Sequence, residues 1–386
     1  MNTKKINFFR IFWPIILFLL VLGQLQRIQL GQNLAIYLHD IVIFVWSIVF
    51  FLTKIKFKKL KKIIIQNKYF AAFLIWSIGS LLLRQLLTNF DIKPYLYFLR
   101  TINYLLFAYS LTQLKKLFPK KIKPVFFGVL VTGLTAIGIA LIQYFLMPDG
   151  RHLHIYGWDQ HYYRLMGLFL DPNFTGLIIV LTLLNLLRYK QVKKLKLYLP
   201  YLISVISLAL TFSRSSYLVF LISSFILFLH NFSHKKIKTA SFIAITVVIF
   251  LTSLPFIPKP GGEGVNLSRT STIQSRMRAN SSVMQQLQGF DWLVGLGLFN
   301  NRINEQLNTS HPIHAHFPDS LPVFILSGTG LIGLLLFMLS LIHWGRGLKN
   351  ESIKLIMFIV LLIHSLFNLS LIEPFSLLFF LISIAA

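Results

Sequence analysis

The residues best suited to chemistry are arginines at the edges of long apolar runs. Arg164 enters one such run, Arg214 lies between two of them, and Arg276 and Arg278 lie in a polar stretch. A guanidinium donates two parallel hydrogen bonds to phosphate oxygens, which an ammonium group does not match. These positions therefore predict a site for a phosphate or diphosphate group.

Each of these arginines also has a plainer interpretation. The turn around Arg214 holds serines and no lysine, and Ser215 and Ser216 are candidates to cap the next helix, whose first amide groups favour an anion. The alternative is an ordinary hairpin cap. For Arg276 and Arg278 the alternative is a solvated helix face. For Arg164 and the Asp-Pro-Asn segment that follows, it is a kinked helix start.

The C-terminal end of this polar stretch carries three histidines and an aspartate, at His311, His314, His316 and Asp319. Zinc takes such ligands from a rigid frame, but two prolines and the lack of an HxxxH pair do not fit one, so no metal is predicted. Histidine accepts a proton near neutral pH, which suits a general base. His316 lies nearest the next apolar run, and Asp319 is placed to orient it.

Membrane-spanning helices must position these residues. The chain is 55% hydrophobic and 13% charged, whereas soluble domains carry about 25% charged residues. Apolar runs near the ~20 residues needed to cross a bilayer predict an all-α, polytopic integral membrane protein with about twelve transmembrane helices and one large extracytoplasmic loop. The expected spans are 8–26, 34–53, 69–88, 95–113, 123–147, 165–187, 197–213, 215–231, 238–254, 318–342, 354–371 and 374–386.

The charges predict the orientation. Lysines and arginines cluster at 54–68, 115–123, 188–196, 235–238 and 346–354, in alternate loops, which makes those loops and both termini cytoplasmic. The same placement explains the net charge of +27 without nucleic acid. The chain has no cysteine, so it forms no disulfide or thiolate nucleophile. The N-terminal run is expected to be a retained first span, not a removed signal peptide.

The organisation follows from these spans. Residues 1–254 carry the first nine helices, 255–317 form the large loop with the candidate catalytic residues, and 318–386 carry the last three helices. Within the loop, 270–289 predicts an amphipathic helix, and Gly295 and Gly297 predict a turn where two backbone segments approach closely. Arg84 is expected to reach lipid headgroups, while Arg100 either does the same or lines a polar cavity.

Four segments in order resemble one family. They are RLMGLFLDPNFTG at 164–176, TFSRSS at 211–216, SRMRANSSVMQQLQGFDWLVGLGLFNN at 275–301 and HAHFPDSLPVFILSGTGLIGLLLF at 314–337. Together they resemble the O-antigen ligase and polymerase superfamily of bacterial inner-membrane glycan transferases. The resemblance assigns the family's serine-arginine motif to Ser213 and Arg214, and its loop arginine to Arg276, with Arg278 as the alternative.

The resemblance also assigns the remaining positions of the family pattern. The glycine-rich turn falls on Gly295 and Gly297. The family's His-Asn pair, eleven residues before Gly330, falls on Asp319 and Ser320, so the base is either Asp319 or a shifted His316, with His314 as the neighbouring candidate. Its late acidic or polar position falls on Asn368 or Glu373.

The implied function is metal-independent and cofactor-free transfer or polymerisation of glycan at the outer face of the cytoplasmic membrane. The implied partners are an undecaprenyl-diphosphate-linked glycan donor, a glycan or lipid-linked acceptor, and membrane lipids. Two other classes stay open. A lipid-linked oligosaccharide flippase would show internal repeats and polar groups at mid-membrane depth. An assembly or sensor protein would tolerate loss of Arg214 and His316.

Overall fold

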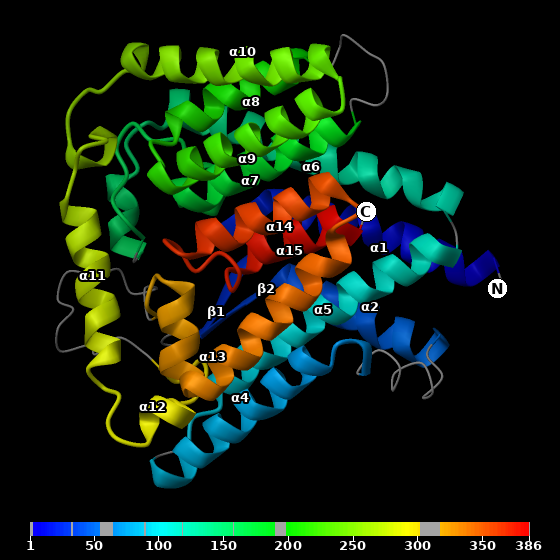
Figure 1. The fold of residues 1–386 in the computed structure, drawn as a ribbon, viewed down its shortest axis with the longest axis vertical. Helices are drawn as coiled ribbons and strands as arrows, with labels where there is room; N and C mark the ends of the chain where they lie inside the picture. Colours follow the sequence, from blue (N-terminus) through cyan, green and yellow to red (C-terminus); the bar gives the residue numbers. More distant parts are fainter. Residues whose placement is uncertain are drawn as a thin grey trace.

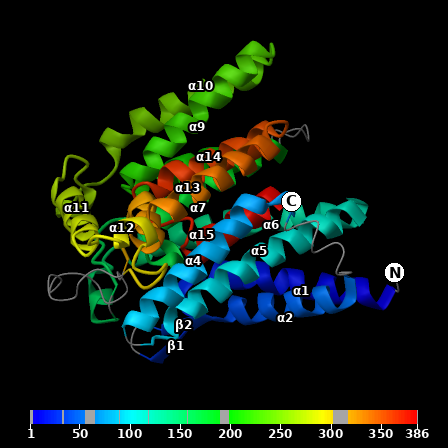
Figure 2. The same cartoon turned by 60° about the horizontal axis from the view of Figure 1, so that its bottom comes forward.

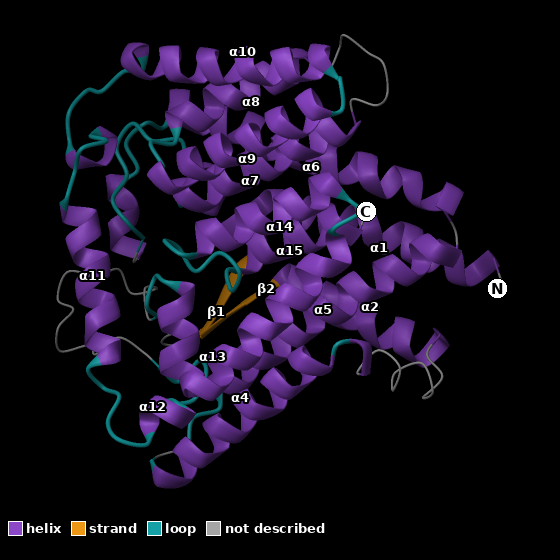
Figure 3. Ribbon diagram, viewed as in Figure 1, coloured by secondary structure: helices purple, strands orange, loops and turns teal. Residues whose placement is uncertain are grey.

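A computed structural model describes residues 3–31, 34–54, 65–88, 90–117, 119–156, 158–189, 198–301 and 317–385. Long helices run roughly parallel to one another and account for most of the chain (Figures 1 and 3). The long helices are α1 (Thr3–Leu22), α2 (Leu38–Lys54), α4 (Lys68–Leu87), α5 (Lys93–Leu117), α6 (Pro119–Leu146), α7 (Pro172–Tyr189), α8 (Tyr198–Leu210), α9 (Arg214–Ser233), α10 (Ile237–Ser253), α13 (Leu321–Leu348), α14 (Ser352–Ser365) and α15 (Pro374–Ala385).

Every expected span overlaps one of these helices, but the residues that the structure describes do not form twelve long apolar helices. Within the described residues, six helices are long and apolar enough to cross a membrane: 68–87, 127–146, 172–189, 214–233, 237–256 and 321–348. Five more apolar helices are shorter, at 12–26, 38–52, 198–210, 352–365 and 374–385. The expected span 95–113 lies in α5, whose lysines, Arg100 and tyrosines make it less apolar. The chain is thus a multi-pass membrane protein with six candidate spans, and the count of twelve is wrong.

One expected span begins with a strand instead of a helix. Strands β1 (Arg27–Gly31) and β2 (Leu34–Tyr37) form an antiparallel hairpin in which Arg27 lies opposite Tyr37. Alternating polar and apolar residues on either side of a Gly-Gln-Asn segment are the sequence signal for this hairpin. Because β2 occupies residues 34–37, helix α2 begins four residues later than expected.

Helices α14 and α15 lie in the middle of the bundle (Figure 1). α14 packs against α7, α9 and α13, and α15 packs against α5 and α7. Polar side chains join α7 to α15, because Asn185 Nδ2 donates to Ser383 Oγ at 3.0 Å and Arg188 Nη1 donates to the Ser383 carbonyl at 3.0 Å. The middle of the bundle therefore carries hydrogen bonds as well as apolar contacts.

The basic ends of three helices meet at one end of the bundle. Lys115 ends α5, Arg188 ends α7, and Lys354 begins α14, and their charges repel one another. Burial, and then Lys354, lower the pKa of Lys115 to about 8. Glu351, just before α14, pairs with Lys354 at 2.7 Å. This convergence agrees with placing these loops on one side of the membrane.

The other end is covered by the large polar segment. Its helix α11 (Ser271–Met284) crosses the ends of the long helices, and α12 (Asp291–Val294) follows it (Figures 1 and 2). The amphipathic helix expected at 270–289 is thus present. Val283 and Leu287 are buried, whereas Ile273 and Met277 are exposed. Short 3-10 helices complete the described chain, at Gly23–Gln26, Arg151–Tyr156, Gly167–Phe169, Leu254–Phe256 and Glu263–Val265.

Two glycines fasten this segment to α13. Gly330 interrupts the α13 helix with φ 65°, and a Cβ on it would overlap the backbone of Leu293. Gly295 has φ 85°, and a Cβ on it would overlap the backbone of Gly328. Only glycine permits both the left-handed conformation and such an approach. The close backbone approach expected at Gly295 is therefore confirmed.

Candidate functional site

The turn between α8 and α9 is the centre of the candidate site. Phe212 in this turn adopts φ 50°, which turns the carbonyls of Thr211 and Phe212 toward neighbouring arginines. Ser213 then caps α9, because its Oγ accepts a hydrogen bond from the Ser216 backbone amide. The cap is thus Ser213, and not Ser215 or Ser216 as expected from the sequence.

Two buried arginines hold this turn. Arg164 Nε donates to the Thr211 carbonyl at 3.0 Å, and its Nη2 donates to the Phe212 carbonyl at 3.4 Å. Arg269 Nη2 donates to the same Phe212 carbonyl at 3.3 Å. Their exposed fractions are 7% and 8%. Burial, and then the positive charge of Arg269, lower the pKa of Arg164 to about 10, so Arg164 remains charged at neutral pH.

Arg214 and Arg276 complete the group. Arg214 Nη1 donates to the carbonyl of Arg269 at 2.8 Å, which ties the large loop to the first turn of α9. Arg276 reaches in from α11, and its charge repels that of Arg214. We call Arg164, Arg214, Arg269 and Arg276 the arginine cluster. Because carbonyl groups are neutral, these hydrogen bonds hold the side chains without cancelling their charge.

The carboxylates near the cluster offset only part of that charge. Asp319, just before α13, lies 3.8 Å from Arg276 Nε and is 45% exposed. Asp171 and Asp159 lie within electrostatic range of Arg164. The Asp171 Oδ1 accepts the Asn173 backbone amide at 2.5 Å, so it caps the start of α7. The plainer interpretation of Asp171, a helix start, is the one that the structure bears out.

The structure brings some of the expected site residues together and leaves others apart. Arg164, Arg214 and Arg276 lie in the cluster, with Asp319 beside it, whereas Arg278 is exposed on α11. His311, His314 and His316 lie outside the described residues. Within the described ranges, no group of three or more His, Asp or Glu side chains gathers.

Beneath the cluster lies a set of polar side chains in which the serines were singled out from the sequence but His364 was not. Ser213 Oγ donates to Asn173 Oδ1 at 2.8 Å, and the Oγ atoms of Ser215 and Ser216 each lie 3.2 Å from His364 Nε2. His364 is fully buried. These residues come from α7, α9 and α14, so three helices contribute to one polar patch inside the bundle.

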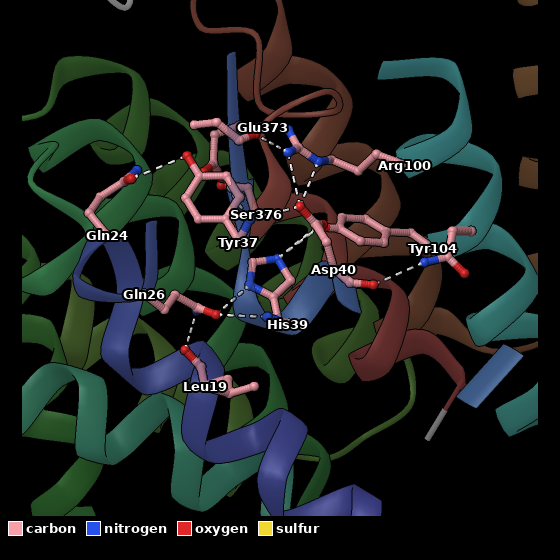
Figure 4. A network of polar contacts seen from close by, with 12 residues as sticks. Leu19, Gln24, Gln26, Tyr37, His39, Asp40, Arg100, Tyr104, Glu373 and Ser376 are labelled. Atoms are coloured by element: carbon pink, nitrogen blue, oxygen red, sulfur yellow. Dashed lines mark hydrogen bonds and ion pairs between the residues drawn. The ribbon is translucent and has the colours of Figure 1, made fainter. Parts of the chain in front are cut away.

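A second polar region lies near the hairpin, at the start of α2 (Figure 4). Asp40 Oδ2 accepts from Arg100 Nε at 3.0 Å and forms an ion pair with its Nη2 at 2.9 Å. Tyr104 donates to the other Asp40 oxygen and lies 2.6 Å from His39 Nε2. Gln26 accepts from the His39 backbone amide at 2.9 Å. We call these five residues the Asp40 network.

The Asp40 network borders a cavity of about 200 Å³. Arg100 lines it together with Asp40 and Asn103, so the expectation that Arg100 lines a cavity holds but the expectation that this cavity is polar does not. The rest of the lining is largely apolar, as in Phe44 and Leu99. Arg84 also departs from simple headgroup contact, because it lies 3.5 Å from the Asp291 carboxylate at the start of α12.

Glu373 lies between the two regions, in the turn before α15. Its Oε2 accepts from the Ser376 amide at 2.6 Å. Burial, in the largest part, raises the pKa of Glu373 to about 7, and the charge of Asp171 adds to this. Its charge also acts on Tyr37, which stacks beneath the Arg100 guanidinium at 5.2 Å. Glu373 and Asn368, the two candidates for one family position, therefore occupy different surroundings.

The arrangement as a whole can bind an anion at one end of a membrane bundle. The arginine cluster supplies positive charge with fork geometry, the first amides of α9 add a favourable helix end, and the large loop covers the site. No model of a known protein family matches the chain, and no curated protein matches it in sequence.

Proposed function

We propose that the protein transfers or polymerises polyprenyl-diphosphate-linked glycan at the outer face of the bacterial cytoplasmic membrane. The observation that carries this proposal is the arginine cluster, in which side chains from three separate segments converge on the α8–α9 turn. A diphosphate at a membrane surface is the ligand that matches several guanidinium groups beside apolar helices. The resemblance of four segments to the O-antigen ligase and polymerase superfamily points the same way.

The orientation of the bundle supports an outer-face site. Asn173 near the start of α7 contacts the cluster turn, whereas Arg188 at the end of α7 lies with the basic helix ends. The cluster and the basic ends thus lie at opposite ends of one spanning helix. Because basic loops are retained in the cytoplasm, the cluster faces outward and both termini face inward.

In the proposed reaction, an acceptor hydroxyl attacks the anomeric carbon of the donor sugar. The new bond joins that oxygen to the carbon, the bond from carbon to the diphosphate oxygen breaks, and polyprenyl diphosphate leaves. Arg214 and Arg276 stabilise the charge that grows on the leaving group. His316 or Asp319 takes the hydroxyl proton. The step needs neither a nucleotide nor a metal ion, because the diphosphate is already a good leaving group.

The place of Asp319 supports its part of this scheme. Asp319 lies beside Arg276 at the edge of the cluster, and His316 comes three residues before it in the chain. A base at Asp319 acts next to the group that binds the diphosphate. The pH dependence of transfer distinguishes the two candidates, because an imidazole and a carboxylate lose basicity at different pH values.

The test is glycan transfer by the purified protein in proteoliposomes. Arg214→Lys and Arg276→Lys keep the charge but lose the fork, so each is expected to reduce transfer by about 10²-fold or more. Arg151→Lys is the matched control, because Arg151 is an exposed arginine that pairs with Asp149. Near-normal transfer by both cluster variants would reject the proposal.

A second arm of the same assay identifies the base. Loss of the base is expected to reduce the rate by about 10²–10⁴, so His316→Ala, His314→Ala and Asp319→Ala are compared under one set of conditions. An inactive Asp319→Ala beside a normal His316→Ala would assign the carboxylate. Transfer that EDTA abolishes and zinc restores would contradict the metal-independent scheme.

A further inference from the structure

A chain of side-chain hydrogen bonds runs from the arginine cluster into the bundle. Arg276 Nη2 donates to Asn368 Oδ1 at 2.8 Å, and Asn368 Nδ2 donates to Ser215 Oγ at 2.9 Å. Ser215 Oγ lies 3.2 Å from His364 Nε2, and His364 Nδ1 lies 2.6 Å from Ser370 Oγ. The chain thus joins α11 to α9 and α14, elements that are far apart in sequence.

The chemistry of these groups determines which of them donates and which accepts along the chain of hydrogen bonds. Arginine only donates, so the Asn368 oxygen must face Arg276 and its amide nitrogen must face Ser215. The hydroxyl of Ser215 is then able to donate to His364 Nε2, while Nδ1–H donates to Ser370. One neutral tautomer of His364 therefore satisfies every contact along the chain.

The described structure shows no evident need for this chain of hydrogen bonds. Asn368, Ser215 and His364 are 4%, 7% and 0% exposed, and buried polar networks add little stability compared with apolar residues of similar shape. Arg276, by contrast, is repelled by Arg214. The exposed Asp319 carboxylate lies 3.8 Å from its Nε, and Asn368 adds a buried hydrogen-bond partner at 2.8 Å that fixes the direction of the guanidinium.

We propose that His364 is a positioning residue of the diphosphate site, which it serves through Ser215 and Asn368 by fixing the guanidinium of Arg276. This inference rests on the proposed function. Asn368 engages one donor of Arg276, and arginine has five, so donors remain for phosphate oxygens. If the Arg276 guanidinium is ordered before the ligand binds, binding does not have to pay the entropy of ordering it, and Arg276 stays close to Arg214.

The inference is tested by binding of farnesyl diphosphate, a short polyprenyl diphosphate, to the full-length protein in detergent. His364→Ala and Asn368→Ala are each expected to weaken binding about tenfold, which corresponds to a coupling of ~1.4 kcal/mol. His364→Gln, which can both accept and donate, is expected to recover part of the loss. Ser370→Ala removes a single contact of His364 and is expected to show a smaller loss in the same direction.

Two comparisons separate positioning from general damage to the fold. Ser223→Ala is the control in α9, because its buried hydroxyl donates to the Phe220 carbonyl of its own helix, and it is expected to bind normally. In an Arg276→Ala background, His364→Ala is expected to weaken binding no further, because its effect passes through Arg276.

The outcomes distinguish the inference from the proposed function. Wild-type protein that does not bind farnesyl diphosphate contradicts both. Binding that depends on Arg276 but not on His364 or Ser370 overturns the inference and leaves the proposed function standing. A loss in His364→Ala that adds in full to that of Arg276→Ala also overturns the inference, because it marks a structural role.

Discussion

The arginine cluster and the Asp40 network both hold buried arginine at one end of the same bundle, but they balance its charge differently. Arg100 in the Asp40 network has a carboxylate partner at 2.9 Å. Arg164 and Arg214 in the cluster donate to backbone carbonyls. A carboxylate neutralises a guanidinium, whereas a carbonyl only orients it.

This difference separates a structural ion pair from a binding site. In a low-dielectric setting a net positive charge attracts an anion strongly, while a neutral pair has no such effect. The Asp40 network is therefore expected to govern stability, and the arginine cluster to govern ligand affinity.

The largest expected effect is on stability, from Asp40→Asn. This change leaves Arg100, whose side chain is 16% exposed, without its charge partner, and the cost of breaking a fully buried pair, about 3–5 kcal/mol, is the upper limit of the expected loss. Thermal unfolding in detergent is expected to show a clear drop in Tm. The double variant Asp40→Asn with Arg100→Gln removes both charges and is expected to recover much of the loss. A Tm unchanged by Asp40→Asn would remove the contrast between the two regions.

A smaller effect is expected on affinity, from Arg269→Gln. Loss of a charge-assisted hydrogen bond costs about 1.5–3 kcal/mol, so farnesyl diphosphate is expected to bind about tenfold more weakly or worse. Arg100→Gln is the matched change in the other region and is expected to leave this affinity unaltered. Equal losses of affinity in the two variants would show that the ligand responds to the total positive charge at this end of the bundle and not to the arginine cluster in particular.

The smallest effect concerns pH and Glu373, which lies between the two regions. The folded-state pKa of Glu373 is about 7, above the ordinary value of 4.5, so the folded protein binds more protons between these values. Stability is therefore expected to fall as pH rises from about 5 to about 8. Glu373→Gln stays neutral, so its Tm should fall by a few degrees less than that of the wild type over this pH range. An identical slope in the variant would contradict the burial of this carboxyl group.

The sequence predicted helix positions better than it predicted their lengths. Hydropathy marks where a helix lies, but not where it ends, and strand β2 takes the first four residues of one expected span. The kink at Gly330 was also not expected, because glycine within an apolar run gives no sign of its φ angle. The close approach at Gly295 was predicted, because a turn that carries two glycines is typical of backbone packed directly against backbone.

The candidate site was partly predictable for a similar reason. Arg214 stood out because charge at the edge of an apolar run is costly. Arg276 lies in the polar stretch and was singled out because its segment carries the family resemblance. Arg269 lies in the same stretch but outside the four segments that carry the resemblance, and an arginine there is ordinary in sequence. His364 was missed because a single histidine in an apolar helix does not reveal its partners, which come here from α9 and the turn after α14.

The part of the large loop between Asn301 and Phe317 leaves and rejoins the bundle at one place. Asn301 Nδ2 donates to the Phe324 carbonyl at 2.7 Å, and the Phe317 ring packs against Phe324 with centroids 5.4 Å apart. Both ends of the intervening segment are therefore anchored to the same turn of α13. Doubling the length of such a segment costs only about 0.6 kcal/mol in closure entropy. Under the proposed function, this segment, histidines included, can be exchanged for one suited to another acceptor without disturbing the helices that would hold the donor.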